Sequence, residues 1–187
     1  VVPTSTVDRM SEQRIKVGVV GAGGRMGRTV CAAVVADPAL ELVAAVDPHA
    51  AGDEVLGIAV ASDQQALADA GAQVAVDFTV AEASRATLPW LAANGIHAVV
   101  GTTGFADDDL AAFRTAFTSS NCLIAANFAI GAVLMMRFAE LAAPWFDTAE
   151  IIELHHDQKI DAPSGTAVTT AQRMAASRDA SWAPDPT

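Results

Sequence analysis

The chain has 187 residues, a length that suits one domain of ordinary size or one domain with part of a second. Hydrophobic residues make up 52% of it and charged residues 18%, so it can bury a sizeable core and is not expected to be disordered. The formal net charge is −11 and no cluster of Lys or Arg occurs. This charge argues against a nucleic-acid partner, because phosphate binding requires local positive charge.

The cysteines and the apolar stretches bear on the cellular location. Cys31 and Cys122 lie in apolar runs without CxxC spacing, which predicts buried free thiols in a reducing cytoplasm. Residues 1–14 lack the apolar segment of a signal peptide and are expected to form a flexible tail. The longest apolar stretch, from Cys122 to Arg137, is too short and too mixed to span a membrane. We therefore expect a cytoplasmic protein with no membrane partner.

Strand-like and helix-like runs alternate along the first two thirds of the chain. The predicted strands cover 15–20, 40–47, 73–79, 97–103 and 122–128, and the predicted helices cover 24–37, 62–70, 81–95 and about 106–118. Apolar strands separated by helices are typical of a parallel sheet covered on both faces. The predicted fold class is therefore α/β, with a Rossmann-like doubly wound parallel sheet.

A second, smaller region follows, in which ionisable residues concentrate. Its pattern predicts a helix over 131–146, a strand over 149–156 and a helix over 165–179. We therefore divide the chain into the tail (1–14), a dinucleotide-binding domain (15–128) and a partial α+β substrate-binding and catalytic domain (129–187).

The segment GAGGRMG (21–27) joins the first predicted strand to the first helix. Glycines in this context let the backbone approach a pyrophosphate, whose charge then faces the helix N-terminus. A glycine motif alone is weak evidence for dinucleotide binding. The alternative is a tight turn that needs glycine for packing. The strand-helix-strand context favours dinucleotide binding.

Asp47 ends the second predicted strand, twenty positions after Gly27. An acidic side chain here accepts hydrogen bonds from the adenosine ribose hydroxyls and repels a 2′-phosphate, which favours NADH over NADPH. A turn-starting aspartate before proline is the alternative. His49 is the basic neighbour of Asp47, and Arg25 or Arg28 could still help to accept NADPH.

Two further predicted strands end in small polar residues, DFT at 77–79 and GTTG at 101–104. Ligands bind at the carboxyl ends of the strands in sheets of this kind, and small residues leave room for a nicotinamide. Ordinary turn chemistry is the alternative, and it would be preferred for GTTG alone.

The segment HHDQKIDAPSGTA (155–167) gathers most of the proton-transfer chemistry. On the predicted strand Glu153, His155 and Asp157 share one face, while His156 takes the other. Histidine is the natural proton donor near neutral pH, and Lys159 can place a positive charge on a carboxylate or donate a proton.

The same segment predicts the start of a helix. Ser164 is a good N-cap, so Gly165 and Thr166 fall in the first turn, where free backbone N–H groups form an anion site. Proton donor, cation and carboxylate cradle together suit the reduction of an acidic ring or imine by hydride.

Other interpretations of this segment compete. In the first interpretation, these are polar loop residues with a surface ion pair of Lys159 and Asp161. In the second, Glu153, His155 and Asp157 bind a metal ion. The density of ionisable residues disfavours the first, and the lack of an obvious second ligand group disfavours the second, so no metal site is predicted. A catalytic cysteine is disfavoured because neither cysteine lies beside a base in the sequence.

Together these motifs resemble the 4-hydroxy-tetrahydrodipicolinate reductase family, also called dihydrodipicolinate reductases, of bacterial lysine and diaminopimelate biosynthesis. The matching stretches, in the order of the family, are GAGGRMG (21–27), DFT (77–79), GTTGF (101–105), AANFAIG (125–131) and ELHHDQKIDAPSGTA (153–167). They span the chain from about 15 to about 180, and the last is long and specific to the family.

The resemblance implies NAD(P)H-dependent reduction of the hydroxylated ring to tetrahydrodipicolinate with loss of water, usually by homotetramers that in many cases accept both NADH and NADPH. The implied catalytic residues are His155 and Lys159, and the implied substrate-binding residues are His156, Gly165 and Thr166. The implied cofactor-binding residues are Gly21, Ala22, Gly23, Gly24, Arg25, Met26, Asp47, Gly101, Thr102, Thr103, Ala125, Ala126, Asn127 and Phe128.

The chain ends in SWAPDPT, directly after the last predicted helix. A lone strand and one helix cannot bury both faces of a sheet, and members of the family continue with further strands. We therefore expect an incomplete second domain, and for the same reason doubt the tetramer. The rival functions are a dinucleotide-binding module without catalysis, such as an inactive fragment of the reductase, and a related enzyme acting on a semialdehyde.

Overall fold

The computed structural model describes residues 14–155, 157, 162–179 and 181–183, and these form two compact units. The first unit ends at Ile124 and the second begins at Ala125. The predicted tail therefore lies outside the described residues, except for Arg14, which pairs with Glu41 at 3.7 Å.

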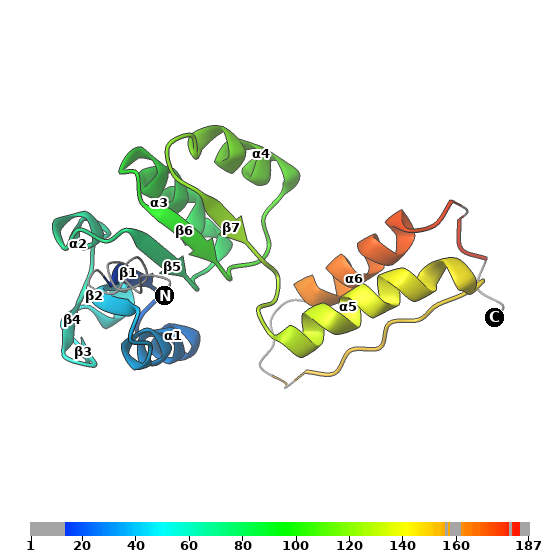
Figure 1. The fold of residues 1–187 in the computed structure, drawn as a ribbon, viewed down its shortest axis with the longest axis horizontal. Coiled ribbons are helices and arrows are strands. Elements are labelled where there is room, and N and C mark those ends of the chain that lie inside the picture. Colours follow the sequence, from blue (N-terminus) through cyan, green and yellow to red (C-terminus); the bar gives the residue numbers. More distant parts are fainter. Residues whose placement is uncertain (1–13, 156, 158–161, 180, 184–187) are drawn as a thin grey trace, which may run out of the picture. The chain divides into compact units, whose positions relative to one another are not determined.

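The first unit is built on a seven-stranded sheet with the order β3-β4-β2-β1-β5-β6-β7 (Figure 1). All neighbouring pairs are parallel except β3 with β4. The strands are β1 (Ile15–Val20), β2 (Leu40–Val46), β3 (Glu54–Val55), β4 (Ile58–Ala61), β5 (Val74–Asp77), β6 (His97–Val100) and β7 (Cys122–Ile124). The predicted doubly wound parallel sheet is confirmed.

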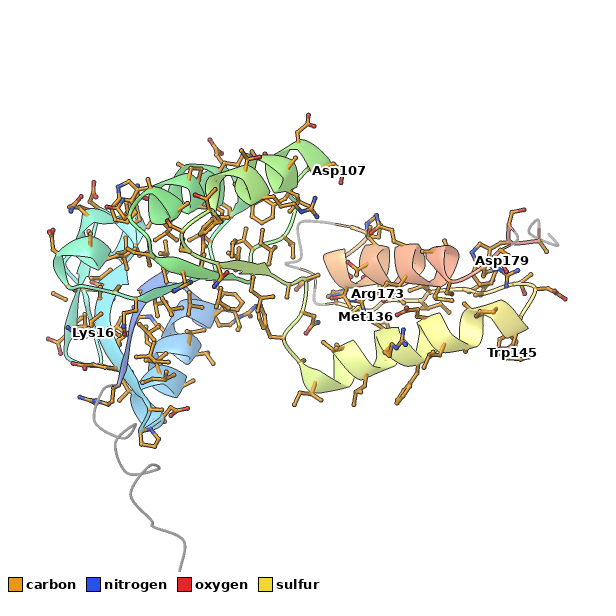
Figure 2. All side chains as sticks on the ribbon, turned by 45° about the horizontal axis from the view of Figure 1, so that its top comes forward. Lys16, Asp107, Met136, Trp145, Arg173 and Asp179 are labelled. Carbon is orange, nitrogen blue, oxygen red and sulfur yellow. The ribbon has the colours of Figure 1, made fainter. Side chains whose placement is uncertain are left out.

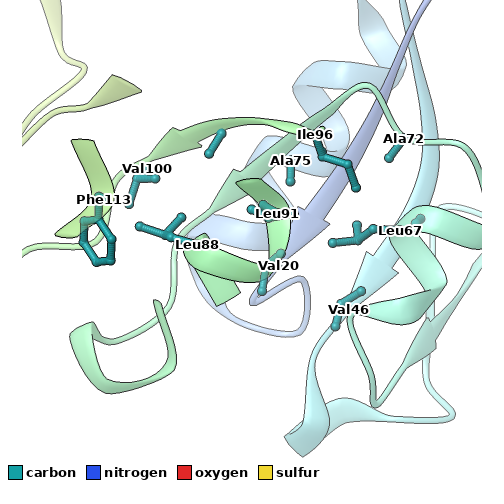
Figure 3. Close-up of a cluster of buried hydrophobic side chains, with 12 residues drawn as sticks. Val20, Val46, Leu67, Ala72, Ala75, Leu88, Leu91, Ile96, Val100 and Phe113 are labelled. Carbon is teal, nitrogen blue, oxygen red and sulfur yellow. The ribbon is translucent and has the colours of Figure 1, made fainter. Parts of the chain in front are cut away.

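Helices cover both faces of this sheet. They are α1 (Arg25–Ala36), α2 (Gln65–Asp69), α3 (Ala81–Ala93) and α4 (Asp107–Ala116). Along β1, Val17 and Val19 belong to a core with Cys31 and Val34 of α1, whereas Val20 belongs to a separate core. That second core contains Leu67 of α2, Leu88 and Leu91 of α3 and Phe113 of α4 (Figure 3). The two-residue period of the strand thus divides the apolar side chains between two helical layers.

The segment between β2 and α2, for which the sequence analysis gives no strand or helix, contains regular structure. It contains the 3-10 helix η1 (Pro48–Ala50) and the antiparallel pair β3 and β4. The strand β4 also pairs with β2, where Ala45 lies opposite Val60. A four-residue strand carries too little pattern to be recognised in the sequence, and its formation depends on the free edge of β2.

The second unit consists of α5 (Ile130–Ala142), the 3-10 helix η2 (Ala143–Trp145) and α6 (Gly165–Ala176). The helices α5 and α6 pack together, and Met136 of α5 is buried on the side that faces α6 (Figure 2). Arg178 connects the C-terminal ends of these helices, because its guanidinium donates hydrogen bonds to the carbonyls of Ala143 and Phe146. The guanidinium also lies 4.0 Å from the ring centre of Trp182.

The prediction of a strand over 149–156 is wrong for the part of that range that the structure describes. Residues 149–155 form a coil, and His156 lies outside the described residues. A strand requires a neighbour for its backbone hydrogen bonds, and the described part of the second unit contains no other strand. The alternating apolar side chains therefore stay in water, with Ile152 82% and Leu154 92% exposed.

A large apolar surface of α5 and η2 is also exposed. Trp145 is 84% exposed and stands at the end of this stretch (Figure 2). The other exposed members are Ile130, Val133, Leu134, Met135, Phe138 and Leu141. Contiguous apolar surface of this kind is usually covered by other protein surface. Within the described residues no helix has both the length and the apolar character needed to cross a membrane.

Gly27 sets how closely α1 approaches the loop before it. A Cβ atom at this position would lie 2.0 Å from the carbonyl oxygen of Gly21 and 2.7 Å from the Cα atom of Ala22. We predict that Gly27→Ala destabilises the protein by about 1–3 kcal/mol, because the backbone of the loop must move away. The measurement is urea unfolding followed by circular dichroism.

Gly131→Ala is the matched control, since Gly131 also lies in the first turn of a helix and a Cβ there meets nothing within 4 Å. It should leave the unfolding midpoint unchanged or raise it, because alanine favours helix more than glycine does. Equal midpoints for Gly27→Ala and the unmodified protein would contradict the close packing.

Candidate functional site

The register of the sheet brings the carboxyl ends of β1, β2, β5 and β6 to one edge. Val20 lies opposite Val46 and Asp77, and Asp77 lies opposite Val100. The segments that follow these residues therefore leave the sheet at the same edge. They contain the glycine loop, Asp47, Thr79 and Gly101. This is the edge at which ligands bind in open parallel sheets.

The glycine loop connects β1 to α1 and is fixed to the end of β2. The backbone N–H groups of Gly21 and Ala22 donate to the carbonyl of Val46 at 2.8 and 3.2 Å. Gly21 has a φ of +77°, which favours glycine, and Gly24 is the N-cap of α1. No side chain caps α1 and its first turn has no acidic residue, so its first N–H groups are open to an anion. Of the residues assigned here, Arg25 and Met26 are exposed.

The carboxylate of Asp47 lies against this loop. Its Oδ2 accepts the backbone N–H of Gly23 at 3.0 Å and its Oδ1 accepts that of His49 at 3.0 Å. A Cβ atom on Gly23 would lie 2.9 Å from Asp47 Oδ2 and 2.4 Å from Ala50 Cβ. The two features predicted for a dinucleotide, the glycine loop and the acidic strand end, therefore lie side by side, and the absence of a side chain at Gly23 lets Asp47 and Ala50 pack directly against the loop.

Asp77 organises the ends of β5 and β6, a role that the sequence analysis did not assign. Its side chain is 0% exposed. Its Oδ1 accepts the Thr79 N–H at 2.9 Å, the Thr79 hydroxyl at 2.6 Å and the Thr102 hydroxyl at 3.2 Å. Its Oδ2 accepts the Ser84 hydroxyl at 2.9 Å. Buried carboxylates need such partners, so the polar run DFT together with a serine one turn into α3 was the available signal.

Gly101, Thr102 and Thr103 differ in their surroundings. A Cβ atom on Gly101 would lie 2.0 Å from the Phe78 ring, so the ring packs directly against this backbone. Thr102 is buried and bonded to Asp77, whereas Thr103 is exposed. The Phe78 ring and Asp77 therefore position the backbone of Gly101 and Thr102, whereas the Thr103 side chain is accessible to a ligand.

The remaining residues predicted on the nicotinamide side, Ala125 to Phe128, belong to the second unit. Ala125 follows β7 directly in the chain, and the side chain of Phe128 is exposed. Asn127 Nδ2 donates to Thr166 Oγ1 at 3.2 Å. The second unit thus joins Asn127, assigned to the cofactor, to Thr166, assigned to the substrate.

The N-terminus of α6 has the predicted geometry. Ser164 is the N-cap and its hydroxyl accepts the N–H of Ala167 at 3.1 Å, while Gly165 and Thr166 open the helix. The bond from Asn127 leaves the hydroxyl hydrogen of Thr166 available to an acceptor. Free N–H groups and this hydroxyl can bind a carboxylate.

His155 and Glu153 lie near this helix start. His155 Nδ1 is 3.6 Å from Glu153 Oε2, and Glu153 Oε1 accepts the backbone N–H of Ser164 at 2.9 Å. His156 and Lys159, both assigned to the site, lie outside the described residues. Among the residues that are described, no group of three His, Cys, Asp or Glu side chains is placed to hold a metal.

Both cysteines are free thiols in environments that disfavour a nucleophile. Burial raises the pKa of Cys31. Burial, followed by the charge of Asp77, raises the pKa of Cys122 to about 11. Because the thiolate is the reactive form, neither residue is suited to covalent catalysis near neutral pH.

A pocket of about 560 Å³ lies elsewhere on the first unit, between α4 and β7. Phe113, Phe117, Ser120 and Cys122 are among its lining residues, and none of the predicted site residues lines it. It is open to solvent and extends along the whole of β7, but its lining includes none of the residues that follow the carboxyl ends of β1, β2, β5 and β6, where ligands of parallel sheets bind. We therefore assign the site to the edge with the glycine loop.

Comparison with known proteins adds independent information. Residues 15–128 match the family model described as "Dihydrodipicolinate reductase, N-terminus", and residues 131–184 match "Dihydrodipicolinate reductase, C-terminus". A 4-hydroxy-tetrahydrodipicolinate reductase of Corynebacterium efficiens is 51% identical over 92% of this chain and 66% of its own length. One of Cutibacterium acnes is 50% identical over 88% of this chain and 62% of its own length.

Solved structures agree with the sequence relatives. A dipicolinate-bound dihydrodipicolinate reductase of a Paenisporosarcina species has a TM-score of 0.76 and 36% identity, covering 94% of this chain and 71% of that chain. A protein from gentamicin A biosynthesis in complex with NAD has a TM-score of 0.56 at 23% identity, covering 72% of this chain and 41% of that one, and supports the fold alone. The chain thus spans somewhat less than two thirds of the length of the curated relatives just described.

Proposed function

Because this chain belongs to the dihydrodipicolinate reductase family, we propose that its activity is the NAD(P)H-dependent reduction of 4-hydroxy-tetrahydrodipicolinate to tetrahydrodipicolinate in lysine and diaminopimelate biosynthesis. The observation that carries the proposal is the presence of two complementary sites in one chain. One is the glycine loop with Asp47, and the other is the start of α6 with His155 beside it.

The second unit supplies the acid-base and anion-binding groups. We assign the proton donor to His155, whose imidazole is exposed, and a second catalytic role to Lys159. Gly165 and Thr166, at the start of α6, bind a substrate carboxylate through N–H groups and a hydroxyl, and His156 binds the substrate edge. In the net reaction the ring gains a hydride and a proton and loses its hydroxyl as water.

The first unit has the groups that fit a dinucleotide. The loop from Gly21 to Gly24 and the open start of α1 receive the pyrophosphate, and Asp47 receives the ribose hydroxyls. Gly101, Thr102 and Thr103 line the nicotinamide side, with Ala125 to Phe128 assigned to the same role. When bound, the reduced nicotinamide supplies the hydride.

The charge at Asp47 supports a preference for NADH, with NADPH as the weaker cofactor. A 2′-phosphate would lie close to this carboxylate, and like charges repel. The guanidinium of Arg28 is already engaged, because its Nε donates to the Gly23 carbonyl at 3.0 Å and it lies 3.7 Å from Asp53. Arg25 is exposed at the start of α1, and its positive charge can reduce the preference for NADH over NADPH without reversing it.

We also propose that copies of the chain associate through the second unit and that the protein works in the cytoplasm. The exposed apolar surface of α5 and η2 supports the first point, because such surface is usually buried in an interface. The free thiols support the second, because disulfides are rare in reducing compartments.

The reductase activity is tested by following the reduced nicotinamide absorbance in a mixture of the protein, NADH and enzymatically generated hydroxy-tetrahydrodipicolinate. We expect substrate-dependent loss of NADH. His155→Gln and Lys159→Ala should each lower turnover by roughly 100- to 10,000-fold, as expected for loss of a general acid, while NADH affinity changes little.

Lys16→Ala is the matched control, because Lys16 is the other lysine of the chain and lies in β1 at the end away from the glycine loop. It should retain the turnover of the unmodified protein. NADH binding without any turnover would instead support the alternative function, a dinucleotide-binding module or an inactive fragment of the reductase.

The cofactor preference is tested by calorimetric titration with NADH and NADPH. We expect NADH to bind about tenfold more tightly, which corresponds to ~1.4 kcal/mol. Asp47→Ser should narrow this difference, because it removes the charge that opposes the 2′-phosphate. Asp37→Ser removes the same charge at the far end of α1 and should leave the preference unchanged. Tighter binding of NADPH by the unmodified protein would contradict the assignment.

A further inference from the structure

The side chain of Glu153 connects two parts of the second unit that are assigned to catalysis and substrate binding. Its Oε1 accepts the backbone N–H of Ser164 at 2.9 Å, and its Oε2 lies 3.6 Å from His155 Nδ1. Eleven positions separate Glu153 from Ser164 in the sequence. One carboxylate therefore fixes the start of α6 with one oxygen and faces the imidazole with the other.

The surroundings of Glu153 strengthen both interactions. Its side chain is 26% exposed, and it lines a small open hollow together with Ile151, Pro163, Val168 and Gln172. Partial exclusion of water strengthens electrostatic interactions. The negative charge also lies at the N-terminal end of α6, where the helix dipole favours it.

The position of the carboxylate decides which imidazole nitrogen can act on a substrate. A carboxylate beside Nδ1 favours the tautomer that carries its proton there. Nε2 is then the nitrogen that exchanges a proton with the substrate. A separation of 3.6 Å is an ion-pair distance, and catalytic hydrogen bonds are often long before a substrate is bound.

We propose that Glu153 is the positioning residue of this site, keeping one imidazole proton of His155 on Nδ1 so that Nε2 is the nitrogen that exchanges a proton with the substrate, while anchoring Ser164 at the anion-binding start of α6. This inference rests on the proposed function of His155. Glu153 itself does not touch the substrate. Its carboxylate thereby links the orientation of the His155 ring to the position of the helix start at which the substrate carboxylate binds.

The substitution Glu153→Gln separates the two roles. Glutamine has the same shape and keeps a carbonyl oxygen for the Ser164 N–H, but it presents an NH₂ donor to His155. We expect His155 to change from the Nδ1–H to the Nε2–H tautomer in its neutral form. The ¹⁵N shifts of labelled imidazoles report this change, and the spectrum of His155→Gln identifies the signal.

Kinetics give the second readout. Glu153→Gln should lower kcat by about 10- to 100-fold, a typical cost of losing the partner that orients a functional histidine, with little change in the substrate KM. Glu153→Ala also removes the acceptor for Ser164, so it should lower kcat and raise KM. Glu140→Gln is the matched control, because Glu140 pairs with Arg137 on the surface of α5, and it should change neither value.

The two readouts distinguish failure of this inference from failure of the proposed function. An unchanged His155 tautomer in Glu153→Gln, with kcat like that of the unmodified protein, would overturn the inference. If the unmodified protein shows no turnover, the proposed function fails, and the tautomer alone decides the role of Glu153. A change of tautomer then supports it, and an unchanged tautomer refutes it.

Discussion

The hydrogen-bonded register of the parallel strands β1, β2, β5 and β6 places those parts of the candidate cofactor site that belong to the first unit. Because Val20, Val46, Asp77 and Val100 lie in one row across the sheet, the segments that follow them share one edge. A shift of one residue in any of these strands would turn its apolar side chains to the opposite face of the sheet and disrupt both cores. The buried side chains thus fix the register, and the register brings Asp47 to Gly23.

The glycines and buried polar groups refine this edge. Gly27 allows α1 to approach the loop, and Gly101 allows the Phe78 ring to pack against the backbone. Asp77 holds Thr79 and Thr102 through a carboxylate that water does not reach. A buried carboxyl group without hydrogen-bond partners is unfavourable, so these hydrogen bonds determine where Thr79 and Thr102 lie. These hydrogen bonds and contacts determine the course of the backbone after β5 and β6, to which we assign the nicotinamide side.

Local patterns were sufficient to predict much of this arrangement. The strand β1, the position of the glycine loop between β1 and α1, the position of Asp47 at the end of β2, and the Ser164 cap were predicted and confirmed, because each depends on a local pattern in the sequence. The hairpin of β3 and β4 depends on the edge of β2, and the coil over 149–155 depends on the lack of a pairing strand among the described residues. The roles of Asp77 and Glu153 depend on partners 25 and 11 positions away, which no periodicity reveals.

We propose that a reduced dinucleotide binds along the edge where β1, β2, β5 and β6 end. Hydrogen-deuterium exchange of the 187-residue protein with and without saturating NADH tests it most directly. We predict slower exchange at 25–28, whose first amides no side chain caps, and at 77–80 and 101–104. Exchange at 110–121, beside the pocket between α4 and β7, should stay unchanged. Protection at 110–121 with none at 25–28 would contradict the account.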